Sequence, residues 1–280
     1  MNRIHINTSI IIVLVLVLRS ANFVNAAIYY SRASGNWNST STWSTSSYGG
    51  AAAASTPGSG AGDIVLISGY TITVTASPVY AIGTIVVTQS NNTGNDTKLY
   101  LNTTGITLRC NTFTVNDNNL NEHIDIEVAQ GTLQVNGNAV FVRTTSNSQS
   151  ENLRLYIRNT GRMNVTGNFS YSLNRAQNNQ SAGNEIQIEN TGRLDVTGNL
   201  TVTVGNNSGQ SSQFDLVLNN SAILNVGGNA SFTVSNSNDG DDLYIDINGG
   251  VFSVTGTLTG TIALTANSGS SLHFYVDGST

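Results

Sequence analysis

Tyrosine, carboxylate and amide side chains recur at alternating positions near the end of each repeated segment of the sequence. A tyrosine ring can stack on the apolar face of a sugar, while carboxylates and amides can hydrogen bond its hydroxyl groups. Residues two apart on a strand point to the same side, so we expect one outward column. The pattern predicts a face that binds a glycan or another cell-surface partner, and a solvated face of ordinary strand-forming residues is the alternative. The residues are Arg154, Tyr156, Glu185, Gln187, Asp215, Tyr244, Asp246, His273 and Tyr275.

A second group of chemically active side chains is acidic. Asp239, Asp241 and Asp242 surround Gly240 in a short polar segment. Calcium takes several oxygen ligands, and a loop with a glycine can fold around the ion. The spacing matches no defined calcium motif, so calcium is one hypothesis and a solvated acidic loop is the other.

Small hydroxyl residues form a third pattern, at outward positions of a different predicted strand. A flat array of threonines on a β-solenoid can order surface water, so ice binding is an alternative function. Exposed strands favour small β-branched residues in any case. The residues are Ser170, Ser172, Thr201, Thr203, Ser231, Thr233, Thr259 and Thr261.

We predict no catalytic residue. A polysaccharide lyase needs a base beside a carboxylate cluster, and a hydrolase needs two carboxylates in one cleft. The acidic residues are instead scattered, and His123 beside Glu122 and Asp125 is an isolated trio. No zinc motif, phosphate loop or Ser-His-Asp pattern occurs. A fragment of a polysaccharide-active lyase or hydrolase remains the alternative from another class.

The elements that must position these residues come from an internal repeat. Three runs of alternating apolar and polar residues, separated by short turns, fill each period. One coil cannot bury its apolar side alone, whereas stacked coils share a core. We predict an all-β fold, a right-handed parallel β-helix with three short strands per coil, and a β-sandwich is the alternative. Equivalent segments begin 30, 31, 30 and 28 residues apart, at Gly131, Gly161, Gly192, Ala222 and Gly250.

Asparagine recurs at two turn positions of this repeat. Asparagine tolerates left-handed backbone conformations and bonds nearby backbone groups, and stacked amides can bond one another along a solenoid axis. We therefore interpret both sets as structural ladders at the coil corners, where ligand binding is not expected. The first set is Asn138, Asn168, Asn199 and Asn229, and the second is Asn159, Asn190 and Asn220.

Three regions follow from the pattern along the chain. Residues 1–26 carry Arg3, an apolar run and small residues, which together predict a cleaved secretory signal peptide, and an uncleaved membrane anchor is the alternative. Residues 27–62 hold both tryptophans and predict an N-terminal cap. Residues 63–280 predict the parallel β-helix. Because the last residues again read as a third strand, we expect the sequence to be a fragment or a module ahead of further domains.

Composition limits the partners. Without residues 1–26, nine basic residues face 16 acidic ones, a net charge of −7. Nucleic acid needs a basic stripe, so it is excluded as a partner. Cys110 is the one cysteine, so no disulfide can form within the chain. A secreted or cell-surface protein of this kind depends on its core and its backbone ladders.

The N-terminal residues resemble a known group of proteins. Ala33-Ser34-Gly35-Asn36-Trp37, Ser41-Thr42-Trp43 and the segment Gly62 to Val74 are similar to the start of large secreted β-helical surface proteins of Bacteroidetes. Those proteins often use the type IX secretion route through a C-terminal sorting domain, which does not occur in this sequence. The resemblance implies extracellular placement and an adhesin-like role, without a named ligand.

Overall fold

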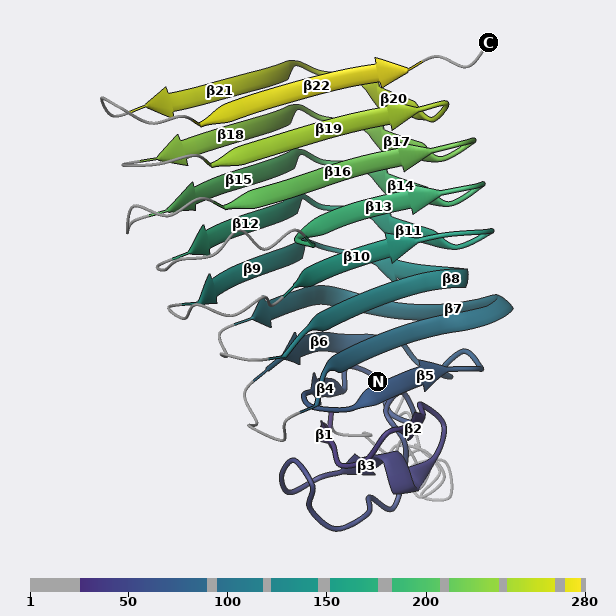
Figure 1. Ribbon diagram of the computed structural model, residues 1–280. Helices are drawn as coiled ribbons and strands as arrows, with labels where there is room; N and C mark the ends of the chain where they lie inside the picture. Colours follow the sequence, from purple (N-terminus) through teal and green to yellow (C-terminus); the bar gives the residue numbers. More distant parts are fainter. Residues whose placement is uncertain are drawn as a thin grey trace, which may run out of the picture.

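The computed structural model describes residues 26–89, 95–117, 122–145, 152–175, 183–206, 212–236, 241–264 and 270–277. Within them the chain forms an all-β solenoid of about six turns with about 29 residues per coil. Its strands are stacked one above another. The chain winds along the solenoid axis in a right-handed sense from β1 (Ile28–Ser31) to β22 (Ser271–Asp277) (Figure 1). The same residues contain no α-helix, and hence no helix able to cross a membrane. The predicted parallel β-helix with three short strands per coil is confirmed.

Three faces run along the solenoid, one for each strand of a coil. The first-strand face contains β11 (Arg162–Val165), β14 (Arg193–Val196), β17 (Ile223–Val226) and β20 (Val251–Val254). The second-strand face contains β9 (Ala139–Thr145), β12 (Phe169–Arg175), β15 (Leu200–Asn206), β18 (Ala230–Asn236) and β21 (Leu258–Leu264). The third-strand face contains β10 (Leu153–Ile157), β13 (Glu185–Glu189), β16 (Gln213–Asn219), β19 (Asp242–Asn248) and β22.

Each strand pairs in parallel with the equivalent strands of the neighbouring coils. On the second-strand face, β12 aligns with β15 without a bulge, from Phe169 opposite Leu200 to Arg175 opposite Asn206. On the third-strand face, β13 aligns with β16, with Glu185 opposite Asp215. Equivalent residues of successive coils therefore stand directly above one another, at the strand spacing of about 4.8 Å.

Alternate residues of every strand point into one continuous core. Leu194 and Val202 are completely buried, while their neighbours Asp195 and Thr203 are partly exposed. Tyr171 packs against Phe214 with ring centres 4.5 Å apart, which joins the second-strand face to the third. Burying each side chain of this size contributes about 1.5–3 kcal/mol, so the core is the main stabilising term.

The coils before residue 139 follow the same plan with longer strands. β7 (Thr97–Asp117) and β8 (Ile124–Val135) each continue through a coil corner, so each contributes to more than one face. The first part of β8 pairs with β10 on one side and with the first part of β7 on the other, which extends the third-strand face downward through Asp125 and Lys98. This extension supplies partners for the candidate site.

The N-terminal region packs around its two tryptophans. Trp37 and Trp43 are completely buried and contact each other edge to face, with ring centres 5.0 Å apart. The Trp37 indole donates to the carbonyl of Pro57 at 3.0 Å, and the Trp43 indole donates to the carbonyl of Trp37 at 2.6 Å. β1 pairs in parallel with β4 (Ile64–Ile67), so the ladder already begins inside the predicted cap. The predicted signal peptide, apart from Ala26, lies outside the described residues.

The first asparagine set links each coil to the next at the corner between the first and second strands. Asn168 Oδ1 accepts a hydrogen bond from the backbone N–H of Asn199 at 2.9 Å, and the same contact recurs one coil down from Asn138. Each oxygen also lies against the glycine that precedes the next asparagine. A Cβ atom on Gly198 would stand 2.5 Å from Asn168 Oδ1, which explains the repeated Gly-Asn pair.

The second asparagine set combines both roles that the sequence suggested. Asn159, Asn190 and Asn220 adopt left-handed backbone conformations with φ of 53°, 58° and 60°. Asn190 Nδ2 donates to Asn159 Oδ1 at 3.3 Å, and Asn220 Nδ2 donates to Asn190 Oδ1 at 3.4 Å. The turn therefore uses asparagine for its conformation and for the axial amide ladder.

Polar residues also occupy two inward columns of the core. Arg143 is completely buried beside the equally buried Asp117, with 3.4 Å between Nε and Oδ2. Arg143 Nη1 also donates to Asn184 Oδ1 at 2.5 Å, and Asn184 takes the inward place that Leu153 has in the coil below. Buried charges are tolerated when they are paired, as Arg143 and Asp117 are, and the hydrogen bond to Asn184 further satisfies the guanidinium.

The Gly-Asn corner gives a stability prediction. We expect Gly198→Ala to lower the free energy of unfolding by about 1–3 kcal/mol, because the added Cβ must displace the Asn168 side chain or the backbone of Gly167. Thr197→Ala, in the same turn, should cost less than about 0.5 kcal/mol because the threonine side chain is exposed. Chemical denaturation of both variants measures the difference, and equal stabilities would contradict the close contact.

Candidate functional site

The structure brings the nine predicted glycan-face residues into two parallel columns on the third-strand face. Arg154, Glu185, Asp215, Tyr244 and His273 stand above one another in the first column. Tyr156, Gln187, Val217, Asp246 and Tyr275 form the second. The columns continue downward through Asp125 and Glu127 of β8. Their local environments divide the face into a lower and an upper half.

Ion pairs occupy the lower half. Arg154 binds the Asp125 carboxylate through two hydrogen bonds of 2.6 and 2.9 Å. Glu127 lies between two cations, with Lys98 in contact on one side and Arg158 Nε 3.1 Å away on the other. Opposite charges on adjacent coils stabilise the stack and leave these groups engaged with one another.

Tyr156 belongs to this lower network. The guanidinium groups of Arg154 and Arg158 lie 5.4 and 5.0 Å from its ring centre, which places cations over the ring. Its hydroxyl donates to Glu185 Oε1 at 2.5 Å. Burial and this hydrogen bond raise the pKa of Tyr156. Arg154, Tyr156 and Glu185 therefore act together as a cross-coil brace, and the ring is already engaged by cations.

The upper half is acidic. β13, β16, β19 and β22 contain no lysine or arginine, but they stack Glu185, Asp215 and Asp246 close together. Burial, followed by the charges of Glu185, Asp246 and Asp242, raises the pKa of Asp215, although Gln213 donates to its carboxylate. Protonated or hydroxyl-bearing groups are favoured beside such a surface, and anionic ligands are repelled.

Three stacked aromatic rings form a platform at the top of this acidic half. Tyr244 on β19 stacks on His273 of β22, with ring centres 4.6 Å apart and planes 8° from parallel. Tyr275 lies beside His273 at 5.6 Å and 5°, and its hydroxyl is 3.1 Å from His273 Nδ1. Tyr275 is about half exposed, at 51%. These parallel, partly exposed rings and the nearby carboxylates give the apolar surface and the hydrogen-bonding groups that a sugar ring requires.

The acidic loop is partly described. Asp239 lies outside the described residues. Asp241 is completely buried, its Oδ1 accepts from the backbone N–H of Ser212 at 2.6 Å, and its Oδ2 has no hydrogen-bond partner in the described part of the chain. Asp242 accepts from the hydroxyl of Ser271. No group of three or more His, Cys, Asp or Glu side chains suited to a metal ion occurs among the described residues, so calcium binding stays a hypothesis.

The hydroxyl residues of the second-strand face stand in two regular columns. Ser170, Thr201, Ser231 and Thr259 align in one column, and Ser172, Thr203, Thr233 and Thr261 align in the other. The columns run side by side on one sheet, as the sequence predicted. The first column alternates serine with threonine, so every second coil lacks the threonine methyl group there.

The His123 trio takes part in structural contacts. His123 Nδ1 accepts a hydrogen bond from the backbone N–H of Asn152 at 2.9 Å, and Asp125 is bound by Arg154. Cys110 is buried, and burial raises the pKa of its thiol to about 12, so its reactive thiolate form is disfavoured.

Sequence reasoning missed the partners supplied by the lower coils. Lys98, Asp125, Glu127 and Arg158 hold the lower half together, yet none was assigned to the face. A usable signal was present, because Ile124, Ile126 and Val128 alternate in the same way as the later third strands.

Comparisons with protein-family models, with curated proteins and with solved structures found no match. The resemblance to Bacteroidetes surface proteins therefore stays a prediction, while the β-solenoid itself is shown.

Asp241 gives a prediction about pH. Burial raises the pKa of Asp241 from 3.8 to about 6. Its contribution to stability is complete below about pH 4, the unfolded pKa, and is lost as the pH rises through the folded pKa. We expect Asp241→Asn, which keeps the oxygen that accepts from Ser212, to be more stable than the parent at pH 7.5, by on the order of 2 kcal/mol. The difference should vanish near pH 3.5.

Melting temperatures across this pH range test the prediction, and a constant difference between the two proteins would contradict it. Repeating the measurement with millimolar calcium tests the metal hypothesis. A calcium-dependent rise in the parent that is absent from Asp241→Asn would show that Asp241 binds the ion.

Proposed function

We propose that this chain is a non-catalytic module of a secreted or cell-surface protein, stalk-like or adhesin-like, whose third-strand face binds glycan. The observation that carries the glycan assignment is the platform of Tyr244, His273 and Tyr275. Asp246 lies next to Tyr275 in the same column and offers acceptors for sugar hydroxyls. The acidic surroundings favour a neutral glycan over an anionic one.

Support for a non-catalytic role comes from the contacts of the ionisable side chains. Asp125, Glu127 and Glu185 are bound to basic or tyrosine partners, and His123 accepts a backbone hydrogen bond. A glycosidase needs one carboxylic acid and one carboxylate on either side of the scissile bond. Side chains that hold neighbouring coils together are poorly placed to carry out that proton transfer.

The platform gives a binding prediction. We expect Tyr244→Ala combined with Tyr275→Ala to weaken glycan binding by about 1–3 kcal/mol, because the stacking surface is removed. Stability should change little because both side chains lie on the outer face, where Tyr275 is about half exposed and Tyr244 is partly exposed. Residues 27–280 would be tested against neutral and anionic polysaccharides by affinity electrophoresis and calorimetry.

The matched control is Tyr80→Ala, an exposed tyrosine at 47% that lies away from the third-strand face. Equal affinity of the parent and the double variant for every bound glycan would rule out the platform. Release of new reducing or unsaturated ends would overturn the non-catalytic assignment and favour the polysaccharide-active alternative.

Ice binding is a second candidate because the hydroxyl columns of the second-strand face are in register. We expect no thermal hysteresis from the parent, since alternate coils lack a threonine methyl group in the first column. Thermal hysteresis that is present in the parent and lost in Thr203→Tyr with Thr233→Tyr would make ice binding the leading function.

A further inference from the structure

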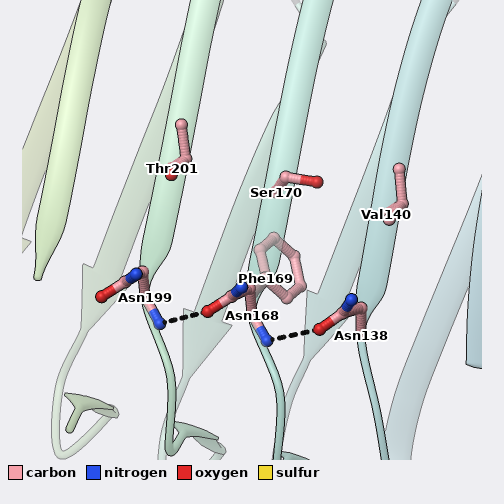
Figure 2. A pocket seen from close by; sticks show the side chains of 7 residues that line it. All are labelled: Asn138, Val140, Asn168, Phe169, Ser170, Asn199 and Thr201. Carbon is pink, nitrogen blue, oxygen red and sulfur yellow. Dashed lines mark hydrogen bonds between the residues drawn. The ribbon is translucent and has the colours of Figure 1, made fainter. Parts of the chain in front are cut away.

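A groove runs along the corner where the chain turns into the second-strand face. It crosses three coils and encloses about 320 Å³. Asn138, Asn168 and Asn199 line one side, and Val140, Ser170 and Thr201 line the other (Figure 2). The residues of each side are equivalent in successive coils, so the groove follows the solenoid axis.

The asparagine side chains present hydrogen-bond donors to this groove. Each Oδ1 accepts a hydrogen bond from a backbone N–H of the next coil, with an N–O distance of 2.9 Å for both Asn138 and Asn168. This contact fixes the orientation of each amide, and the three amides point the same way in Figure 2. Their Nδ2 groups make no hydrogen bond within the described part of the chain. Three exposed donors are therefore held in a row.

The spacing of the donors selects the kind of ligand. Successive coils are about 4.8 Å apart, so a polymer lying along the groove should repeat at about this distance. An extended peptide advances about 3.3 Å per residue and falls out of step with the coils. A sugar unit in an extended, linear polysaccharide has a length close to the coil spacing, so one unit can face each coil.

The chemistry of the lining points to the same ligand. None of the seven lining residues, which include Phe169, is charged, and the chain as a whole is acidic, so a polyanion has no counter-charge here. The hydroxyl groups of Ser170 and Thr201 can donate and accept, and the methyl groups of Val140 can contact an apolar sugar edge. We propose that this groove binds a neutral, linear polysaccharide parallel to the solenoid axis, with one sugar unit for each coil.

This site is separate from the aromatic platform. The groove belongs to the second-strand face, and the platform belongs to the third. The inference therefore goes beyond the proposed function and shares no residue with it. It also gives the first asparagine set a binding role in addition to its structural one.

The test uses linear neutral oligosaccharides, namely cello- and manno-oligosaccharides of two to six units, measured by calorimetry. We expect the parent to bind, with an affinity that rises with length until the three coils of the groove are spanned. Asn168→Asp keeps an oxygen for the Asn199 N–H but replaces the donor with an acceptor. Affinity should fall on the order of tenfold while the melting temperature stays unchanged.

Asn102→Asp is the matched control, because it makes the same change of charge at an exposed position outside the groove. Thr201→Trp is a second variant that fills the groove from an exposed strand position and should abolish binding. It keeps the test decisive if Asn168→Asp is unstable.

Two results would overturn the inference. One is the absence of binding to every linear neutral oligosaccharide, and the other is unchanged affinity in Asn168→Asp and Thr201→Trp. If binding is lost only in Tyr244→Ala with Tyr275→Ala, the groove is not the site and the proposed function stands.

Discussion

The backbone ladder between successive coils is the constraint on which the rest of this structure depends. From β4 onward, the described strands pair only with strands of neighbouring coils, so their N–H and C=O groups must match the coils above and below. That requirement keeps the strands of successive coils in register. Gly198 shows how tight the match is, because even a methyl group there would collide with Asn168.

Exact stacking also determines the electrostatics of the outer faces. The nearest neighbours of an outward side chain are the side chains at the equivalent positions of the next coils, whatever their charge. Where the signs alternate, as for Asp125 and Arg154, the pair braces two coils. Where they repeat, as for Glu185 and Asp215, the neighbouring charge adds to the larger effect of burial in raising the pKa of the aspartate. The contrast between the lower and upper halves of the third-strand face thus follows from stacking, without any difference in fold.

Much of this architecture could be predicted because its signals are local and repeated. Alternation such as Leu194–Val196 sets the inward side, and each Gly-Asn pair marks a corner. Two features could not be predicted in this way. Arg143 and Asn184 point into the core. From the sequence alone, a polar residue at an inward position suggests a loop, because its buried partners are far away along the chain. β7 and β8 pass through the corner between the third and first strands without the turn asparagine of the second set. The third strand of these coils is therefore not marked off by a turn, and the lower columns, with Asp125 and Glu127, were missed. Consequently the nine residues of the predicted glycan face lie on one outward face, but the bracing of Tyr156 by two arginines was not anticipated.

The strands lie across the solenoid axis, so tension applied along the axis acts directly on the hydrogen bonds between coils. Such a load concentrates on one coil boundary at a time, and the coils detach in sequence. Each detached coil of about 29 residues can extend to roughly 100 Å, in place of the 4.8 Å that it occupies in the stack. The molecule is therefore stiff while its ladder is intact and becomes highly extensible beyond a threshold force, lengthening in nearly equal steps that dissipate mechanical work.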